Sequence, residues 1–505
     1  MGKWPGIALL LTILLPAHAA WAEVPRPERL LLLVFDQMRP DYIDRFQLKH
    51  FQKLRAQATN YPNAIVGHLG AETVVSHLVL STGRLPKDLP WMDEVLCDKA
   101  GTLGAANAFY ATGALAPEQL LQLMRTLPKE TLLPFQVKQR RPGFVAAVGE
   151  KDYATLVFGT PAADAVVSLH KSHGICTPDG IAVPRYIATS DRFTLECSNA
   201  YGTERSFYPI DGARFVPGDD PAHLGGDVWV TDVALQLMDH EDWSALFLTF
   251  GGIDKIGHLT GEADGPMPLD FEPKYHLEDA LRTADAQLGR LLAELERRGL
   301  RDKTLVVVTA DHGGQSDRRY LGMGRSGKAM AGHGAEGETL APWLRHLREA
   351  GNVAATFQDS AIRVWLTDMA PVNVAAVLGA LRAISGVTEI HALAQEDAGW
   401  RYRRVYAALA QEPAAFRSWA AAHSEALVGT MANPAGPTFI ALLADGVGFD
   451  LLGDHGGAQE HVQRIPLMLL DPSRKPQTIR AFVGLSQVRD IILAALACGR
   501  AAGCP

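Results

Sequence analysis

The sequence predicts an α/β fold with a doubly wound, mostly parallel sheet and helices on both of its faces. Continuous apolar runs rich in branched residues occur at 29–35, 245–250 and 305–308. Strands that are buried on both faces have this composition, and such burial is typical of parallel sheets. Helical periodicity between the runs, clearest at 277–298, completes the strand–helix alternation of a doubly wound sheet.

In the first part of the chain, the run RLLLLVF at 29–35 predicts a buried strand that ends at Asp36. Residues 41–58 are expected to form a helix, followed by a turn at 60–63 that contains proline. The apolar segment TVVSHLVL at 73–80 predicts the opening of a buried helix, which stops at Thr82-Gly83.

Later elements continue the pattern. The strand at 245–250 is followed by two glycines, and the helix at 277–298 carries leucine and alanine on one face and stops at Gly299. The strand at 305–308 leads into Asp311, and late strands are expected at 438–443 and 465–470.

Two segments interrupt this alternation. Residues 86–225 are mixed, contain prolines and hold three cysteines, and residues 315–437 contain a glycine-rich loop followed by a strand–helix–strand pattern at 360–393. We therefore expect one large domain at 23–505 with inserted subdomains at about 86–225 and 315–437.

The N-terminus has the pattern of a signal peptide. Lys3 precedes an apolar stretch at 7–15, and Ala20-Trp21-Ala22 resembles a cleavage site, so residues 1–22 are expected to be removed. An uncleaved anchor is the alternative, but the stretch is shorter than the ~20 residues needed to span a bilayer. We expect a periplasmic or secreted protein without a membrane span after cleavage.

Export makes disulfides possible among the five cysteines. Proximity suggests the pairs Cys176–Cys197 and Cys498–Cys504, with Cys97 left over, and five free thiols are the alternative. The net charge of −8 argues against non-specific nucleic-acid binding, which needs a basic surface.

Acidic and imidazole side chains follow several of the predicted strands. Ligands of open α/β sheets bind at the carboxyl ends of strands, and a carboxylate beside an imidazole suits a borderline metal such as zinc. Singly, each residue has an ordinary structural role, such as helix capping by Asp36. Together they supply enough ligands for two metals: Asp36, Asp254, His258, Asp311, His312 and His455.

The order of these motifs resembles the alkaline phosphatase superfamily, in its branch of nucleotide pyrophosphatase/phosphodiesterases and single-domain bacterial alkaline phosphatases. The resemblance covers most of the mature chain and implies the fold of that superfamily. It is carried by Asp36, Thr73-Val-Val-Ser-His77 with Thr82-Gly83, Asp254-x3-His258, Asp311-His312-Gly313, and His455-Gly456 ahead of Ile465-Pro466-Leu467.

The resemblance implies two Zn²⁺ ions, although other divalent metals are possible. Asp254, His258 and His455 would hold one ion. The other ligands would be Asp36, Asp311, His312 and the Thr73 oxygen. Thr73 would attack a small phosphate ester to give a phosphothreonine, which water would then hydrolyse. Ser76 competes with Thr73 as the nucleophile, and His333 competes with His455 as the late ligand.

Two positions depart from the family pattern. Glu94 falls where the family has an asparagine that binds a phosphoryl oxygen, and the K-x-R motif of the monoesterases here reads Lys151-Asp152-Tyr153. Lys151, Tyr153 and Glu94 are nevertheless the candidate substrate contacts, and Lys151 is also a catalytic candidate. A carboxylate and a single hydroxyl compensate a phosphate dianion less well than an amide and a guanidinium.

We therefore expect an exported two-metal phosphohydrolase with a slight preference for monoesters, a preference that depends on Lys151. The alternatives are a phosphodiesterase or nucleotide pyrophosphatase and, in another class, a metal-binding protein that has lost turnover. A sulfatase would need a modified Cys or Ser in C/S-x-P-x-R, and Cys176-Thr177-Pro178 does not complete that motif. A membrane-bound phosphoethanolamine transferase would need membrane spans, and a phosphoglycerate mutase of this superfamily would be cytoplasmic.

Overall fold

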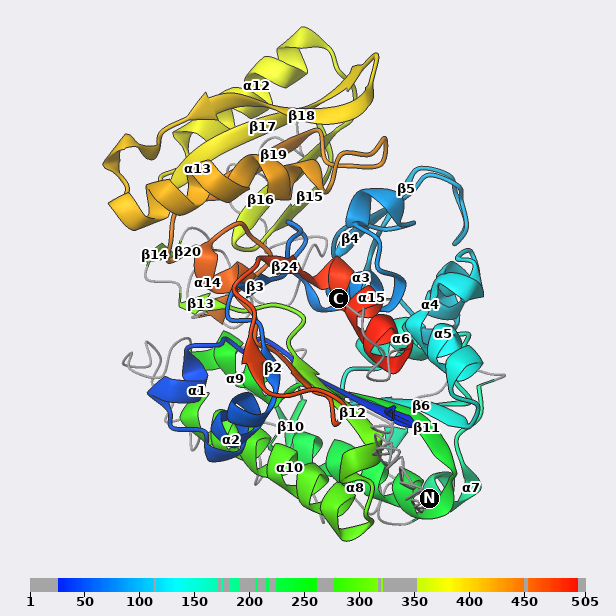
Figure 1. Cartoon of the computed structure of the whole chain (residues 1–505). Helices are drawn as coiled ribbons and strands as arrows, with labels where there is room; N and C mark the ends of the chain where they lie inside the picture. Colours follow the sequence, from blue (N-terminus) through cyan, green and yellow to red (C-terminus); the bar gives the residue numbers. More distant parts are fainter. Residues whose placement is uncertain are drawn as a thin grey trace, which may run out of the picture.

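The structure is a computed structural model (Figure 1). It describes the residues 26–112, 115–170, 174–175, 181–190, 205–207, 215–217, 224–260, 277–316, 319–320, 352–448 and 453–497. The predicted signal peptide, His333 and both predicted cysteine pairs lie outside these residues. Cys97 is described: it is a buried free thiol, and burial raises its pKa.

A nine-stranded sheet forms the centre of the molecule, in the order β23-β2-β22-β12-β1-β11-β6-β7-β8. The fourth to the eighth strands in this order are parallel to one another. The strands in sheet order are β23 (Gln477–Thr478), β2 (Thr59–Asn60), β22 (Leu467–Leu470), β12 (Thr304–Thr309), β1 (Arg29–Phe35), β11 (Trp243–Phe250), β6 (Phe144–Gly149), β7 (Ala165–His170) and β8 (Gly174–Ile175). The predicted mixed α/β fold with a mostly parallel sheet is confirmed.

Helices cover both faces of this sheet, as Figure 1 shows. One face carries α2 (Lys49–Gln57), α8 (Leu224–His240) and α10 (Leu277–Arg297). The other carries α3 (Thr73–Thr82), α5 (Leu133–Arg140), α6 (Asp152–Gly159) and α15 (Leu485–Ala497). The predicted apolar face of α10 is buried against the core, and the helix ends before Gly299, whose φ is +63°.

The helix predicted at 41–58 is two helices, α1 (Tyr42–Arg45) and α2. Gln47 lies between them with φ +50°, in the left-handed region. An α-helix cannot continue through a residue in that conformation, so the chain changes direction there.

A separate five-stranded antiparallel sheet has the order β15-β16-β19-β17-β18. Its strands are β15 (Val353–Gln358), β16 (Ala361–Leu366), β17 (Val387–Glu396), β18 (Gly399–Ala407) and β19 (Phe439–Leu443). The expectation that 438–443 belongs to the doubly wound sheet is therefore wrong. Phe439 packs with α12 (Pro371–Ala383) and Ile440 with α13 (Ala414–Gly429), so β19 is buried on both faces and has the composition of a parallel strand.

The segment 86–225 is expected to be an inserted subdomain, but part of it belongs to the central sheet. Its apolar runs form β6 and β7, and both lie in the central sheet beside β11.

The remaining short elements are β3 (Ala64–Ile65), β4 (Val95–Asp98), β5 (Ala108–Ala111), α4 (Pro117–Met124), α7 (Arg185–Ala188), β9 (Arg205–Phe207), β10 (Phe215–Pro217), α9 (Gly252–Thr260), β13 (Gln315–Ser316), β14 (Arg319–Tyr320), β20 (Val447–Gly448), β21 (Gly453–Asp454), α14 (Glu460–Gln463) and β24 (Val483–Gly484). Among the described helices, none is long and apolar enough to cross a membrane.

At Gly313, the backbone that follows β12 lies very close to the backbone of residues 461–464. A substitution at Gly313 therefore tests the packing in this region. Its N–H donates to the Val462 carbonyl at 2.8 Å, and a Cβ there would collide with the His461 carbonyl and lie 2.9 Å from the Arg464 carbonyl. Backbone cannot move aside as a flexible side chain can. We expect Gly313→Ala to lower the free energy of unfolding by about 1–3 kcal/mol, measured by chemical denaturation.

Gly379→Ala is the matched control, because a Cβ at Gly379 in α12 meets no atom within 4 Å. Replacing a helical glycine by alanine should stabilise the protein by about 0.5–1 kcal/mol. Equal effects of the two substitutions would contradict the tight packing at Gly313.

Candidate active site

The predicted ligands meet because three parallel strands end at the same edge of the sheet. Val34 of β1 is in register with Thr249 of β11 and with Thr309 of β12. Asp36, Asp311 and His312 follow β1 and β12 directly, and Asp254 and His258 lie on α9 just beyond β11. His455 enters from the loop after β21, which pairs with β13. All six side chains are buried.

Asp36, Asp311 and His312 form one cluster whose potential ligand atoms lie within 4.8 Å of one another. His312 Nε2 is 3.4 Å from Asp36 Oδ1 and 3.7 Å from Asp311 Oδ2. These are the three side chains that the sequence assigned to one metal, and the fold brings them together.

Asp254, His258 and His455 form a second cluster. His258 Nε2 and His455 Nε2 are 3.1 Å apart, and they lie 3.3 Å and 3.4 Å from Asp254 Oδ1. His312 also lies within 4.8 Å of Asp254 and His455. The two clusters are therefore contiguous, with His312 between them.

The orientation of the three imidazoles fits metal binding. His258 Nδ1 lies 3.0 Å from the Gly453 carbonyl, His312 Nδ1 lies 2.9 Å from the Gly313 carbonyl, and His455 Nδ1 lies 2.9 Å from Glu72 Oε2. Each oxygen can only accept, so each Nδ1 carries a proton and donates it. Each Nε2 then faces the carboxylates and could coordinate a metal, which is the arrangement that outer-shell oxygens impose on metal-binding histidines.

The carboxylates repel one another strongly in this buried setting. Burial and the charges of Asp254 and Asp311 raise the pKa of Asp36 well above its usual range. Burial also raises the pKa of Asp311, to about 6. Oδ1 of Asp36 and Oδ2 of Asp311 lack a hydrogen-bond donor among the described residues. Bound cations would satisfy these oxygens and relieve the repulsion, so the donor set fits a two-metal site.

Lys151 is the cation that contacts these carboxylates in the structure. Its Nζ lies 2.6 Å from Asp36 Oδ2 and 2.6 Å from Asp254 Oδ2. Burial alone would lower the pKa of Lys151, but Asp254 and Asp36 outweigh burial and raise it well above its usual range. The predicted lysine therefore lies inside the site as an ammonium ion, rather than on the surface.

Thr73 is the first residue of α3 and lies beside both clusters. Its Oγ1 is 3.3 Å from Lys151 Nζ and 3.4 Å from His312 Nε2. Ser76, the rival nucleophile, instead places its Oγ 3.4 Å from His68 Nε2. The N-terminus of a helix attracts anions through its free N–H groups, so Thr73 is well placed to meet a phosphoryl group.

Glu94 and Tyr153 lie within electrostatic range of this site. Burial and the charge of Glu72 raise the pKa of Glu94 to about 7, while a 2.5 Å hydrogen bond from Thr112 Oγ1 opposes the rise. Burial raises the pKa of the Tyr153 phenol, and Lys151 opposes that rise. Both residues therefore lie near the candidate centre.

Two residues of the site were missed by the sequence analysis. The Gln37 backbone N–H donates to Asp311 Oδ1 at 3.3 Å, and its Nε2 donates to Asp254 Oδ1 at 3.4 Å. Glu72 accepts from His455, as described above. Gln37 and Glu72 are each adjacent in sequence to a predicted site residue. The direction of a polar side chain at a strand end or a helix start cannot be inferred from the sequence, so neither was predicted to face the site.

The start of α9 is held by two further carboxyl groups. Gly251 N–H donates to Glu150 Oε1 at 2.9 Å, and Gly252 N–H donates to Asp227 Oδ1 at 3.2 Å. Burial and the neighbouring Glu150 raise the pKa of Asp227 well above its usual range. Because Asp254 lies in the first turn of α9, this pair helps to fix its position.

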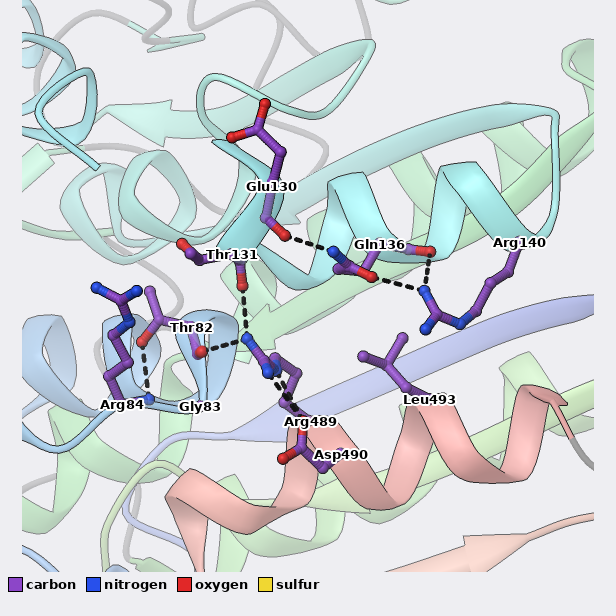
Figure 2. Close-up of a pocket in the computed structure, with 10 residues that line it drawn as sticks. All are labelled: Thr82, Gly83, Arg84, Glu130, Thr131, Gln136, Arg140, Arg489, Asp490 and Leu493. Atoms are coloured by element: carbon purple, nitrogen blue, oxygen red, sulfur yellow. Dashed lines mark hydrogen bonds and ion pairs between the residues drawn. The ribbon is translucent and has the colours of Figure 1, made fainter. Parts of the chain in front are cut away.

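A cavity of about 440 Å³ lies at the opposite end of α3 from Thr73, and Figure 2 shows the residues that line it. Arg489 Nη1 donates there to the carbonyls of Thr82 and Thr131, at 2.5 and 2.8 Å, and so joins α15 to α3. The cavity holds none of the predicted site residues, and its contacts indicate a structural role.

Solved structures share this fold. Alkaline phosphatase PafA aligns with 94% of this chain and 96% of its own, at a TM-score of 0.63 and 16% identity. Murine ectonucleotide pyrophosphatase/phosphodiesterase 5 covers 93% and 95%, at 0.54 and 13%. Phosphonoacetate hydrolase from Sinorhizobium meliloti 1021 covers 94% and 97%, at 0.51 and 13%. None of the curated protein sequences matches significantly.

At such low identities these likenesses establish the fold, which is that of the alkaline phosphatase superfamily. A family model described as type I phosphodiesterase / nucleotide pyrophosphatase matches residues 30–89 and 170–375, more than half of the chain. The matched ranges include Asp36, Thr73, Asp254 and Asp311-His312. The protein belongs to the type I phosphodiesterase / nucleotide pyrophosphatase family.

Proposed function

We propose that this protein is an exported phosphohydrolase that uses two Zn²⁺ ions and Thr73 to cleave small phosphate esters, with a slight preference for monoesters. The observation that carries the proposal is the pair of Asp/His clusters, in which each imidazole turns its Nε2 toward the carboxylates, beside a threonine at the N-terminus of a helix. Membership of a family of phosphoester hydrolases supports the reaction class. Export is inferred from residues 1–22 alone.

In this proposal, Asp254, His258 and His455 hold one ion, and Asp36, Asp311, His312 and Thr73 hold the other. The ions would lower the pKa of the threonine hydroxyl and of a water molecule and neutralise developing charge. Thr73 Oγ would form the bond to phosphorus while the bond to the leaving oxygen breaks. Water then hydrolyses the phosphothreonine and regenerates the hydroxyl.

The residues of this chain have distinct roles in that reaction. The first N–H groups of α3 would receive the phosphoryl oxygens. Lys151, 3.3 Å from the Thr73 hydroxyl, would compensate the charge of a monoester dianion. Burial of all these groups excludes water and strengthens their electrostatic interactions.

Two of the similar structures bear on the roles of Thr73, Glu94 and Lys151. The murine phosphodiesterase 5 has an inactive variant, in which a threonine is replaced by alanine, in complex with AMP. A PafA variant has a threonine, an asparagine, a lysine and an arginine substituted. In that variant the asparagine follows the threonine by 21 positions, as Glu94 follows Thr73, and the arginine follows the lysine by two, as Tyr153 follows Lys151.

Thr73→Ala tests the nucleophile. We expect turnover of p-nitrophenyl phosphate and of its bis ester to fall by about 10³-fold or more, because the group that bonds to phosphorus is lost. Ser76→Ala is the control and should retain most of the activity. Zinc-loaded wild-type protein that hydrolyses neither ester would instead favour the metal-binding protein without turnover.

Lys151→Met tests the source of the monoester preference. Monoester turnover should fall by about 10- to 100-fold more than diester turnover, since a dianion needs the ammonium more than a monoanion does. Zinc affinity should not fall, because the ammonium competes with cations for Asp36 and Asp254. Equal losses for the two substrates would contradict this role.

Glu94→Asn tests whether Glu94 occupies the position of the family's asparagine, which binds a phosphoryl oxygen. With its pKa near 7, Glu94 is neutral at lower pH and can donate a hydrogen bond, whereas above pH 7 it is a carboxylate that repels a phosphoryl oxygen. We expect kcat/KM for p-nitrophenyl phosphate to rise by about 10-fold at pH 9 and to change little at pH 6. A ratio of variant to wild type that is independent of pH would argue against this placement of Glu94.

A further inference from the structure

The side chain of Arg363 is fully buried at the junction between the five-stranded sheet and the candidate active site. Arg363 belongs to β16 and has an exposed fraction of 0%. Its Nη2 donates to the carbonyl oxygen of Gly456, the residue after His455. Its Nη1 donates to Asp359, and its Nε lies 2.8 Å from Asp93 Oδ2. One guanidinium therefore joins three segments of the chain.

The turn between β15 and β16 also holds the His455 loop directly. Ser360 N–H donates to the His455 carbonyl at 3.0 Å, and Gln459 Nε2 donates to the Ser360 carbonyl at 2.8 Å. With Arg363 on the Gly456 carbonyl, two successive carbonyls of the loop are bound by this turn and strand. The backbone position of His455 therefore depends on the five-stranded sheet.

A second connection reaches the imidazole of His455 itself. The carboxyl group of Asp359 interacts with that of Glu72, and burial and the charge of Glu72 raise the pKa of Asp359 well above its usual range. Glu72 Oε2 in turn accepts from His455 Nδ1 at 2.9 Å. Gly456, with φ +79°, packs against both carboxyl groups, and any Cβ there would collide with them.

We propose that Arg363 is a positioning residue, which directs His455 Nε2 toward its metal through Gly456 and through Asp359 and Glu72. This inference rests on the proposed function. The charge on Arg363 also offsets the buried acidic groups around it, which would otherwise repel one another. Since the contacts of Arg363 with the described residues lie on the His455 side of the centre, its loss should affect one of the two metal ions.

The test is Arg363→Met in the full-length protein, with zinc content measured by equilibrium dialysis over a range of free zinc concentrations. Outer-shell partners of metal ligands typically alter affinity 10- to 100-fold. We expect one of the two bound zinc ions to be weakened by about that factor and the other to keep its wild-type affinity. Arg363→Lys, which retains the charge but not the forked donor geometry, should restore part of the affinity.

Arg404→Met is the matched control. Arg404 lies on β18 of the same sheet and pairs with Glu389 at 3.2 Å, its side chain is 52% exposed, and no contact joins it to the described residues of the His455 loop. Arg404→Met should leave the affinity for both zinc ions unchanged. Thermal melting of metal-free Arg363→Met measures any general loss of stability separately from metal affinity.

Unchanged affinity for both ions in Arg363→Met would overturn the inference, while the proposed function would stand. Equal weakening of both ions would also overturn it, because that result indicates a general structural role. If Arg363→Met does not fold, Glu72→Gln carries the same test, and selective weakening of one ion is again the expected result. Wild-type protein that binds no zinc would overturn the proposed function first and this inference with it.

Discussion

The burial of like charges at one edge of the central sheet is the constraint on which the site depends. Three parallel strands in register deliver Asp36, Asp254 and Asp311 to one place that is shielded from water. Burial of three carboxylates together costs free energy unless cations and hydrogen-bond donors surround them. Lys151, the Gln37 donors and the backbone N–H of His312 all serve this need. The same unmet charge makes the edge of the sheet a suitable site for divalent metals.

The backbone also packs closely around this edge of the sheet. The Gln37 side chain passes against Gly257 and Gly314, where any Cβ would collide with it. Gly313 brings the segment after β12 against carbonyls of α14 and the carbonyl of Arg464, which follows α14. The glycines of the Asp-His-Gly-Gly motif therefore have packing roles in addition to the turn that they form. This close packing restricts the directions that the candidate metal ligands can take.

The five-stranded sheet is part of the site rather than an appendage. Its apolar face packs through α13 against Leu69, Met92 and Ala458, which lie in loops of the main domain. Its polar contribution is Arg363, which reaches the residue next to His455. Arg363 and Asp359 lie almost a hundred residues before His455, in a segment that the sequence suggested was an insertion.

The sequence by itself determined β1, β11, β12 and β22 of the central sheet, the long amphipathic helix and the set of strand-end residues, because apolar runs and polar residues at their ends are local patterns. It could not place β19, since a strand covered by helices on both faces has the same composition in either kind of sheet. Tertiary structure alone decided that Lys151 lies between two carboxylates, that Thr73 and not Ser76 faces the clusters, and that Glu72 and Arg363 support His455. Those contacts join residues from separate elements, and their side-chain directions follow from packing rather than from local sequence.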